Sequence, residues 1–232
     1  MERAWNVCNL GCVEYRAAWE LQEKLQQERR RGERPDTLLV VRHPPVFTIG
    51  RAGSRLHILA GEEVLKKEGI DVWEVDRGGD VTYHGPGQIV VYPILDLRQY
   101  GQDLHVYVRS LEEAIIRTVG AFGVPARREA GLTGVWTDKG KIAAIGIGVK
   151  GWVSIHGIAL NVRPNMQHFQ MIVPCGISNR PVAWLAQWQE NVVEEEVQAC
   201  LLQNLADVLG ATYEEEAFHE TAAAGMAKNQ GA

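Results

Sequence analysis

A cysteine between a proline and a glycine is the residue of this 232-residue chain that is best suited to nucleophilic chemistry. Cys175 lies in the sequence Val173-Pro174-Cys175-Gly176-Ile177. The proline restricts the backbone before the thiol, and the glycine lets a substrate approach the amide N–H, which suits a nucleophile with an oxyanion-stabilising donor. A buried structural thiol is the alternative interpretation. The other three cysteines, Cys8, Cys12 and Cys200, lack such neighbours.

A lysine at the start of an apolar strand is the second candidate. Lys141 precedes the run Ile142 to Val149, in which every residue is apolar or glycine. A lysine in such a site can act as a base or as the cationic partner of a thiolate, although most lysines are solvated. The segment Ala143-Ala144-Ile145-Gly146 has little side-chain bulk. It favours either a smooth floor for an aliphatic chain or close packing within a sheet.

A glycine-rich block, Arg77 to Gln88, separates two apolar runs that are typical of strands. Its glycines indicate a bulge or a close approach of the backbone to a ligand. Arg77 could hold a phosphate or a carboxylate, or pair with Asp80. His84 could relay a proton, as could His156 further along the chain, but a hydrogen-bonded structural role is the more common one for a lone histidine. The block matches neither the P-loop nor the dinucleotide-binding pattern.

The elements that must position these residues alternate between helices and strands. Helical spacing or capping residues predict helices at 13–31, 61–67, 103–123 and 192–209. Apolar runs predict strands at 37–41, 46–49, 71–75, 89–94, 134–137, 141–149 and 152–162, with an irregular stretch at 163–179. Hairpins dominate the middle of the chain, which favours an α+β fold with a mixed, largely antiparallel sheet. We expect one domain over residues 1–213 and a frayed tail over 214–232.

Composition narrows the function classes. The chain is 46% hydrophobic and 23% charged, as in ordinary globular proteins, and its net charge of −5 argues against non-specific nucleic-acid binding. Its start lacks the pattern of a secretory signal, and no apolar run approaches the ~20 residues of a membrane-spanning helix. The pair Cys8 and Cys12 has no second pair at zinc-site spacing. We therefore expect a cytoplasmic protein without a metal, a cofactor, a membrane or a nucleic-acid partner.

Four stretches, in this order, closely resemble the octanoyltransferases of lipoate synthesis, also called lipoyl(octanoyl) transferases. They are Arg77 to Gln88, Gly140-Lys141-Ile142-Ala143-Ala144-Ile145-Gly146, His156 to Val162 and Pro174-Cys175-Gly176, and Arg42 to Gly50 is similar to an upstream motif of that family. The resemblance covers the chain from about Thr37 to Ile177. It implies the fold of biotin and lipoate protein ligases.

The resemblance also implies the reaction and the residues. Such enzymes move an octanoyl group from acyl carrier protein to a lysine of a lipoyl domain, in 2-oxoacid dehydrogenase complexes or the glycine cleavage H protein. The thiol nucleophile of the family maps onto Cys175 and its essential lysine onto Lys141, as a Cys/Lys dyad with a thioester intermediate. Its acyl-binding residues map onto Arg77, Gly78, Gly79, Asp80, Val81, Thr82, Tyr83, His84, Ala144, Ile145, Gly146, Gly157, Ile158 and Ala159.

Three other functions stay open. One is an ATP-dependent lipoate or biotin-type protein ligase, although an adenylate route needs no thiol. Another is an amidotransferase that moves octanoyl groups between lipoyl proteins, and the third is a non-enzymatic module that binds acyl groups. Because acyl carrier proteins are acidic, arginines at Arg42, Arg51, Arg77 and Arg127-Arg128 could steer the donor.

Overall fold

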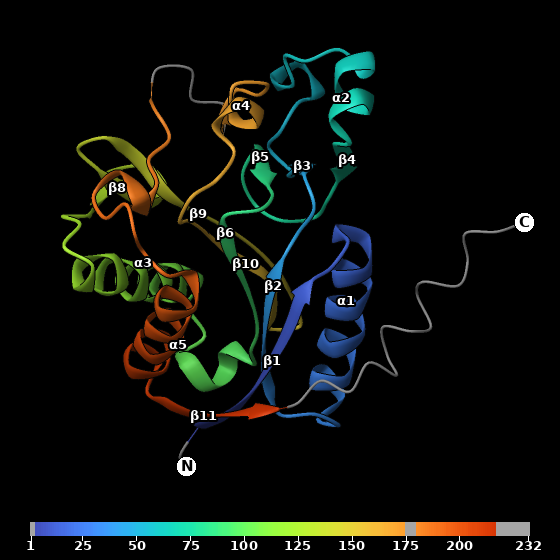
Figure 1. Ribbon diagram of the computed structural model, residues 1–232. Coiled ribbons are helices and arrows are strands. Elements are labelled where there is room, and N and C mark those ends of the chain that lie inside the picture. Colours follow the sequence, from blue (N-terminus) through green and yellow to red (C-terminus); the bar gives the residue numbers. More distant parts are fainter. Residues whose placement is uncertain (1–2, 175–179, 217–232) are drawn as a thin grey trace, which may run out of the picture.

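A twisted eight-stranded sheet forms the centre of the protein (Figure 1). The computed structural model describes residues 3–174 and 180–216. Within these residues the strand order is β11-β1-β2-β6-β10-β9-β8-β7. β1 pairs in parallel with β11 and β2, and all other neighbours in this sheet are antiparallel. The strands are β1 (Arg3–Cys12), β2 (Asp36–Arg42), β6 (Gln88–Ile94), β7 (Arg127–Glu129), β8 (Leu132–Thr137), β9 (Gly140–Lys150), β10 (Val153–Asn161) and β11 (Ala211–Glu216).

A second, three-stranded sheet lies beyond one end of the large one (Figure 1). In it β3 (Val46–Ile49) pairs in parallel with β4 (Asp71–Glu74) and antiparallel with β5 (Val81–His84). The helices are α1 (Tyr15–Arg31), α2 (Glu62–Glu68), α3 (Leu104–Ala121), α4 (Met166–Phe169) and α5 (Glu194–Leu209), with short 3-10 turns η1 (Arg55–His57), η2 (Leu97–Tyr100) and η4 (Leu185–Gln187).

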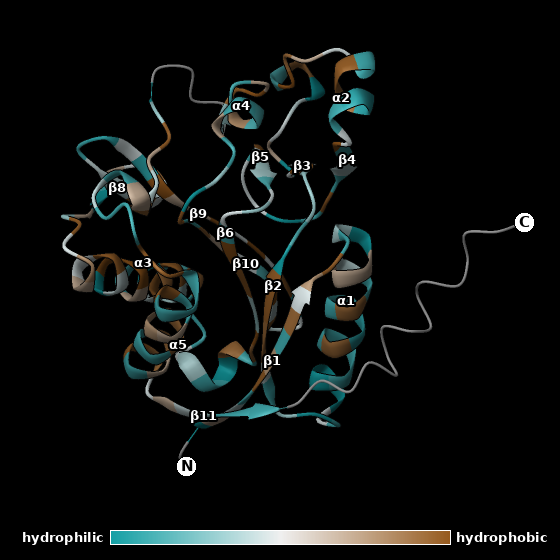
Figure 2. Cartoon of the chain, viewed as in Figure 1, coloured by the Kyte–Doolittle hydropathy of each residue, from teal (hydrophilic) through white to brown (hydrophobic). Residues whose placement is uncertain are grey.

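The alternation of side chains along β2 builds two cores. Leu39 and Val41 point to one face and pack with α1, whereas Leu38 and Val40 point to the other and pack with α3 and α5. The central positions of a strand with both faces covered must be apolar, as residues 38–41 of β2 and 89–91 of β6 are. Figure 2 shows this as hydrophobic colour along the central strands, with hydrophilic residues on the outer surface of α1.

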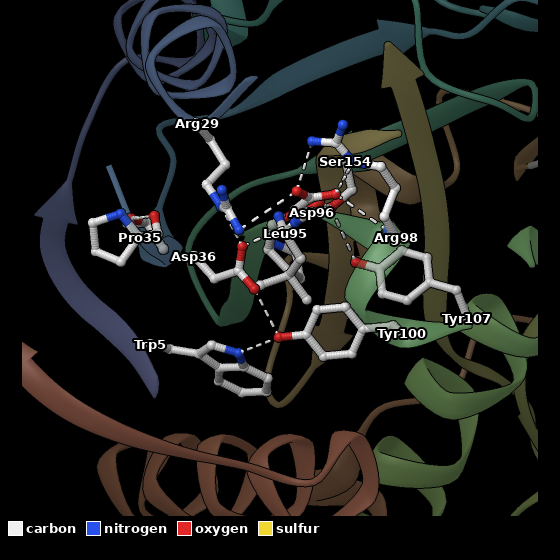
Figure 3. Close-up of polar contacts among 12 residues, drawn as sticks. Trp5, Arg29, Pro35, Asp36, Leu95, Asp96, Arg98, Tyr100, Tyr107 and Ser154 are labelled. Atoms are coloured by element: carbon white, nitrogen blue, oxygen red, sulfur yellow. Dashed lines mark hydrogen bonds and ion pairs between the residues drawn. The ribbon is translucent and has the colours of Figure 1, made fainter. Parts of the chain in front are cut away.

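A polar network fixes the end of the sheet where α1 finishes (Figure 3). The Asp36 carboxylate accepts hydrogen bonds from Arg29 Nε at 2.6 Å and from the Tyr100 hydroxyl at 2.8 Å, and the Trp5 indole donates to that hydroxyl at 2.7 Å. Asp36 is 4% exposed, so the pairing satisfies a buried charge. The network ties together β1, α1, β2 and η2, and so sets how α1 lies across the sheet.

The fold class is confirmed, since the sheet is mixed and mostly antiparallel. Four predicted helices and the hairpin between β8 and β9 are also confirmed. The prediction missed β1, β7 and β11, and it missed the strand β5 inside the glycine-rich block. The expected irregular stretch contains α4, and β11 continues to Glu216, past the domain boundary expected at residue 213. No helix in the described part of the chain is both long enough and apolar enough to cross a membrane.

Candidate active site

A cleft of about 200 Å³ opens beside the strands β9 and β10. It is smaller than the ~300–1,000 Å³ typical of sites for drug-sized ligands, which suits a slender substrate. Most of the predicted site residues line it: Arg77, Gly78, Gly79, Asp80, Thr82, His84, Lys141, Ala144, Ile145, Gly146, Gly157, Ile158 and Ala159. Cys175 lies outside the described residues.

The strand β5 lies inside the glycine-rich block, and its side chains point alternately into the cleft and into a small core. Thr82 and His84 line the cleft. Val81 and Tyr83 are fully buried on the opposite side, where they pack in a cluster with Phe47 of β3. Successive side chains of a strand point to opposite faces, so a contiguous motif in extended conformation can place only alternate residues in a site. Val81 and Tyr83 therefore support the cleft wall from behind.

The side chain of Lys141 lines the cleft and lies against a glycine and a tryptophan of β8. Its Nζ lies 5.3 Å from the centre of the Trp136 ring. Gly134 has a φ of +118°, and a Cβ there would lie 2.6 Å from Lys141 Cε and 3.2 Å from Nζ. The pairing of β8 with β9 also shifts register between Val135 and Trp136. A bulge redirects side chains and commonly lies next to an active site.

Arg77 presents a buried cation to the cleft. The side chain is 7% exposed, and its guanidinium donates to the Thr48 hydroxyl and carbonyl and to the carbonyls of Gly78 and Asp80, at 2.7–3.2 Å. A Cβ on Gly50 would lie 2.8 Å from its NH1 atom. The guanidinium thus fixes the conformation of the glycine-rich block by binding its backbone, and adds a positive charge to the cleft wall.

Three rings of the cleft wall, Tyr15, His84 and Tyr92, are neutral at physiological pH, and the neutral ring of His43 packs against them. Burial lowers the pKa of His43 to about 4. Burial is also the main cause that lowers the pKa of His84 well below its usual value, and the nearby His43 and Arg77 lower it further. His43 Nδ1 donates to the Val13 carbonyl at 2.7 Å, so its Nε2 accepts from the Tyr92 hydroxyl at 2.7 Å. Tyr15 stacks on His84 at 5.9 Å. An uncharged wall of this kind suits an aliphatic chain.

His156 occupies a strained position on the cleft wall. It has a φ of +61° within β10, although it is not glycine, and residues held in this region cluster at functional sites. Its Nε2 donates to Asp76 Oδ1 at 2.7 Å, and this hydrogen bond is the main cause that lowers the pKa of Asp76. Its Nδ1 is buried without a hydrogen-bond partner among the described residues. The pair connects β10 to the residue before the glycine-rich block.

Several lining residues had no signal in the sequence. Tyr15 comes from α1, Tyr92 from β6, Gly131 from the turn before β8, and Leu132 and Thr133 from the start of β8. Tyr15 lies far along the chain from the motifs, and the other four lie near motifs but outside them, so the fold is needed to show that they reach the cleft. Among the described residues, no group of three or more histidine, cysteine, aspartate or glutamate side chains could hold a metal ion.

The arginines proposed to steer a donor differ in their surroundings. Arg77 is buried, Arg42 pairs with two glutamates of α5, and Arg128 pairs with two glutamates of α3. Arg127 lies 2.9 Å from Glu129, and Arg51 is 68% exposed. Of these five, Arg51 is the most accessible to an acidic partner.

Residues 14–206 match the family model described as the lipoyl protein ligase A/B catalytic domain. The chain belongs to this family. It is 50% identical over 183 residues to an octanoyltransferase of Solibacter usitatus, covering 78% of this chain and 83% of that protein. It is 45% identical over 212 residues to an octanoyltransferase of Thermosynechococcus vestitus, covering 91% and 92%. The resemblance predicted from the motifs is therefore confirmed.

The fold of the lipoyl protein ligase A/B family is confirmed separately by a solved structure. A lipoate-protein ligase A bound with ATP superposes with a TM-score of 0.77, at 17% identity, covering 97% of this chain and 92% of that one. At this identity the likeness concerns the fold alone.

Proposed function

We propose that this protein moves an octanoyl group from octanoyl-acyl carrier protein to a lysine of a lipoyl domain, by way of a thioester on Cys175. The observation that carries the proposal is a cleft lined both by Lys141 and by the uncharged segment Ala144, Ile145 and Gly146. Relatives that are named octanoyltransferases at 45–50% identity support the same reaction. The acceptors we propose are the lipoyl domains of 2-oxoacid dehydrogenase complexes and the glycine cleavage H protein.

The first half-reaction forms the acyl-enzyme. The Lys141 ammonium favours the thiolate of Cys175 by its charge. The thiolate attacks the thioester carbonyl, and backbone N–H groups at Cys175 and Gly176 are our candidates to stabilise the oxyanion, each worth about 3 kcal/mol. The tetrahedral intermediate expels the thiolate of the carrier, which takes a proton from Lys141. The octanoyl group is then on Cys175 and Lys141 is neutral.

The second half-reaction restores the starting state. The neutral amine of the acceptor lysine attacks the thioester on Cys175. Lys141, now neutral, accepts the proton that this amine loses as the amide forms. Cys175 leaves as a thiolate beside the ammonium of Lys141. One thioester is used and one amide is made, and no ATP is needed. The free thiol fits a reducing compartment such as the cytoplasm.

The cleft would select the chain length. Each methylene that moves from water to an apolar wall contributes about 0.8 kcal/mol, so a slot of fixed depth favours the chain that fills it. The neutral rings of Tyr15, His84 and Tyr92 would let an uncharged chain lie against them without burying an ion.

Transfer with defined donors tests the proposal against the alternatives. The purified protein, octanoyl-acyl carrier protein and an unmodified lipoyl domain should give octanoylated domain without ATP. A ligase would instead need free octanoate and ATP, and an amidotransferase would use an octanoylated lipoyl protein as its donor. Failure of all three donors, with octanoyl groups bound but never transferred, would point to a binding module and overturn the proposal.

A further inference from the structure

A buried carboxylate of α3 contacts the backbone that makes room for Lys141. Glu112 is fully buried, and its Oε1 accepts a hydrogen bond from the Gly134 amide N–H at 3.0 Å. Gly134 is the residue whose missing Cβ leaves space for the Lys141 side chain. The same residue adopts a φ of +118°, which L side chains rarely adopt. The hydrogen bond thus acts where β8 determines the position of Lys141.

The second oxygen of Glu112 is also occupied. Its Oε2 lies 2.6 Å from Arg109 NH1 and 3.2 Å from Arg128 Nε. The two guanidinium groups hold the carboxylate in one orientation, and a buried charge that is paired and hydrogen-bonded on both sides is rigid. Lys141 itself lies on β9, so the position of its ammonium depends on how β8 is held against it.

From this arrangement we infer that Glu112 is a positioning residue for Lys141, acting through Gly134. The inference rests on the proposed role of Lys141 in the Cys175 dyad. Glu112 fixes the start of β8, and with it the gap through which the lysine side chain passes to the cleft. A displacement of about 1 Å in a reacting group can cost a hundredfold in rate.

Replacing one oxygen of Glu112 by an amide nitrogen disturbs this contact selectively. In Glu112→Gln a single oxygen must serve both the two arginines and the Gly134 N–H. This oxygen binds the two arginines, because hydrogen bonds to charged groups are the stronger ones. The amide NH₂ then faces the Gly134 N–H, donor against donor. We expect octanoylation of Cys175 from octanoyl-acyl carrier protein to slow by about 10- to 100-fold in single-turnover measurements, with the KM for the carrier protein unchanged.

Glu113 offers a matched control. It is the next residue of α3, shares Arg128 at 2.7 Å and binds Arg117 at 3.1 Å, but within the described residues none of its hydrogen bonds reaches β8. Glu113→Gln should keep the wild-type rate. Should Glu112→Gln fold poorly, Glu112→Asp keeps the buried charge but places the carboxylate one methylene short of Gly134, and should be slow as well. Thermal unfolding of each variant checks that the rates refer to folded protein.

A double-mutant cycle with Lys141→Ala separates positioning from general destabilisation. If Glu112 acts through Lys141, Glu112→Gln slows the wild type but has no further effect in the Lys141→Ala protein. An equal, additive loss in both backgrounds would overturn the inference while leaving the dyad in place. A Lys141→Ala protein with the wild-type rate would instead contradict the proposed function.

Discussion

The ammonium nitrogen of Lys141 lies 5.3 Å from the centre of the Trp136 ring, and the guanidinium carbon of Arg180 lies 5.7 Å from the same ring. Trp136 is 2% exposed, so the ring is held by the core and gives the lysine a fixed aromatic neighbour. An aromatic face attracts a cation, by about 0.5–1 kcal/mol at exposed sites and more where water is excluded. The contact between Lys141 and the Trp136 ring therefore stabilises both the charge and the position of the lysine.

Removing the aromatic face should slow acylation. We predict that Trp136→Leu lowers the rate of Cys175 octanoylation by roughly fivefold, which corresponds to about 1 kcal/mol. Trp136→Phe keeps a ring and should lose less. Trp188 is the control, because Lys139 lies 4.1 Å from its ring centre and neither residue lines the cleft. Equal losses in Trp136→Leu and Trp188→Leu would show that the Lys141 contact has no special role.

Helices could be predicted from the sequence because their signals are local. Asp103 caps α3 by accepting from the N–H groups of His105 and Val106, and left-handed Gly32 and Gly210 end α1 and α5. The strand β1 carries no comparable signal. It is defined by pairing with β2 and with β11, about 200 residues further along the chain, and such long-range pairing is not visible in a short window.

The lining of the candidate cleft could be predicted from the sequence where it is formed by contiguous motifs. The glycine-rich block, Lys141 and the segment Gly157 to Ala159 reach one cleft as expected. Val81 and Tyr83 point away from the cleft because side chains alternate along β5. This could be predicted only by knowing that the block contains a strand. Glu112 was not predictable, since a glutamate followed by Glu113 in a helix is typical of a solvated face. Its burial follows from how α3 packs on β8.

The stability of the protein should fall in mild acid because of His43. The folded protein keeps this ring neutral down to about pH 4, whereas the unfolded chain protonates it near pH 6.5. Between these values the unfolded state binds more protons, so the stabilisation present above pH 6.5 is lost as the pH falls to 4. The difference of 2.5 between the two pKa values gives an upper limit of about 3 kcal/mol. Urea unfolding of the wild type and of His43→Gln at pH 7 and pH 4.5 measures it.

The His43→Gln variant should lose less stability than the wild type between these two pH values. His105→Gln is the control, because His105 is exposed, and its pH dependence should match the wild type. Identical slopes for wild type and His43→Gln would show that His43 takes up its proton in the folded state as readily as in the unfolded chain.

Bulk added to the cleft floor should change the preferred acyl chain. We predict that Ala144→Leu shifts the ratio of kcat/KM for octanoyl over hexanoyl carrier protein towards the shorter chain by at least about tenfold. The two chains differ by two methylenes, each worth about 0.8 kcal/mol or roughly fourfold. Val149→Leu is the control, because Val149 lies on the same strand but does not line the cleft. This variant should leave the ratio unchanged. An unaltered ratio in Ala144→Leu would place the acyl chain elsewhere.

Intact-protein mass spectrometry after incubation with octanoyl-acyl carrier protein, without an acceptor, tests the central claim most directly. The account predicts one octanoyl group per chain, located on Cys175 by peptide mapping, absent in Cys175→Ala and formed much more slowly in Lys141→Ala. An octanoyl adduct that persists in Cys175→Ala, or that forms at the wild-type rate without the Lys141 amine, would contradict it.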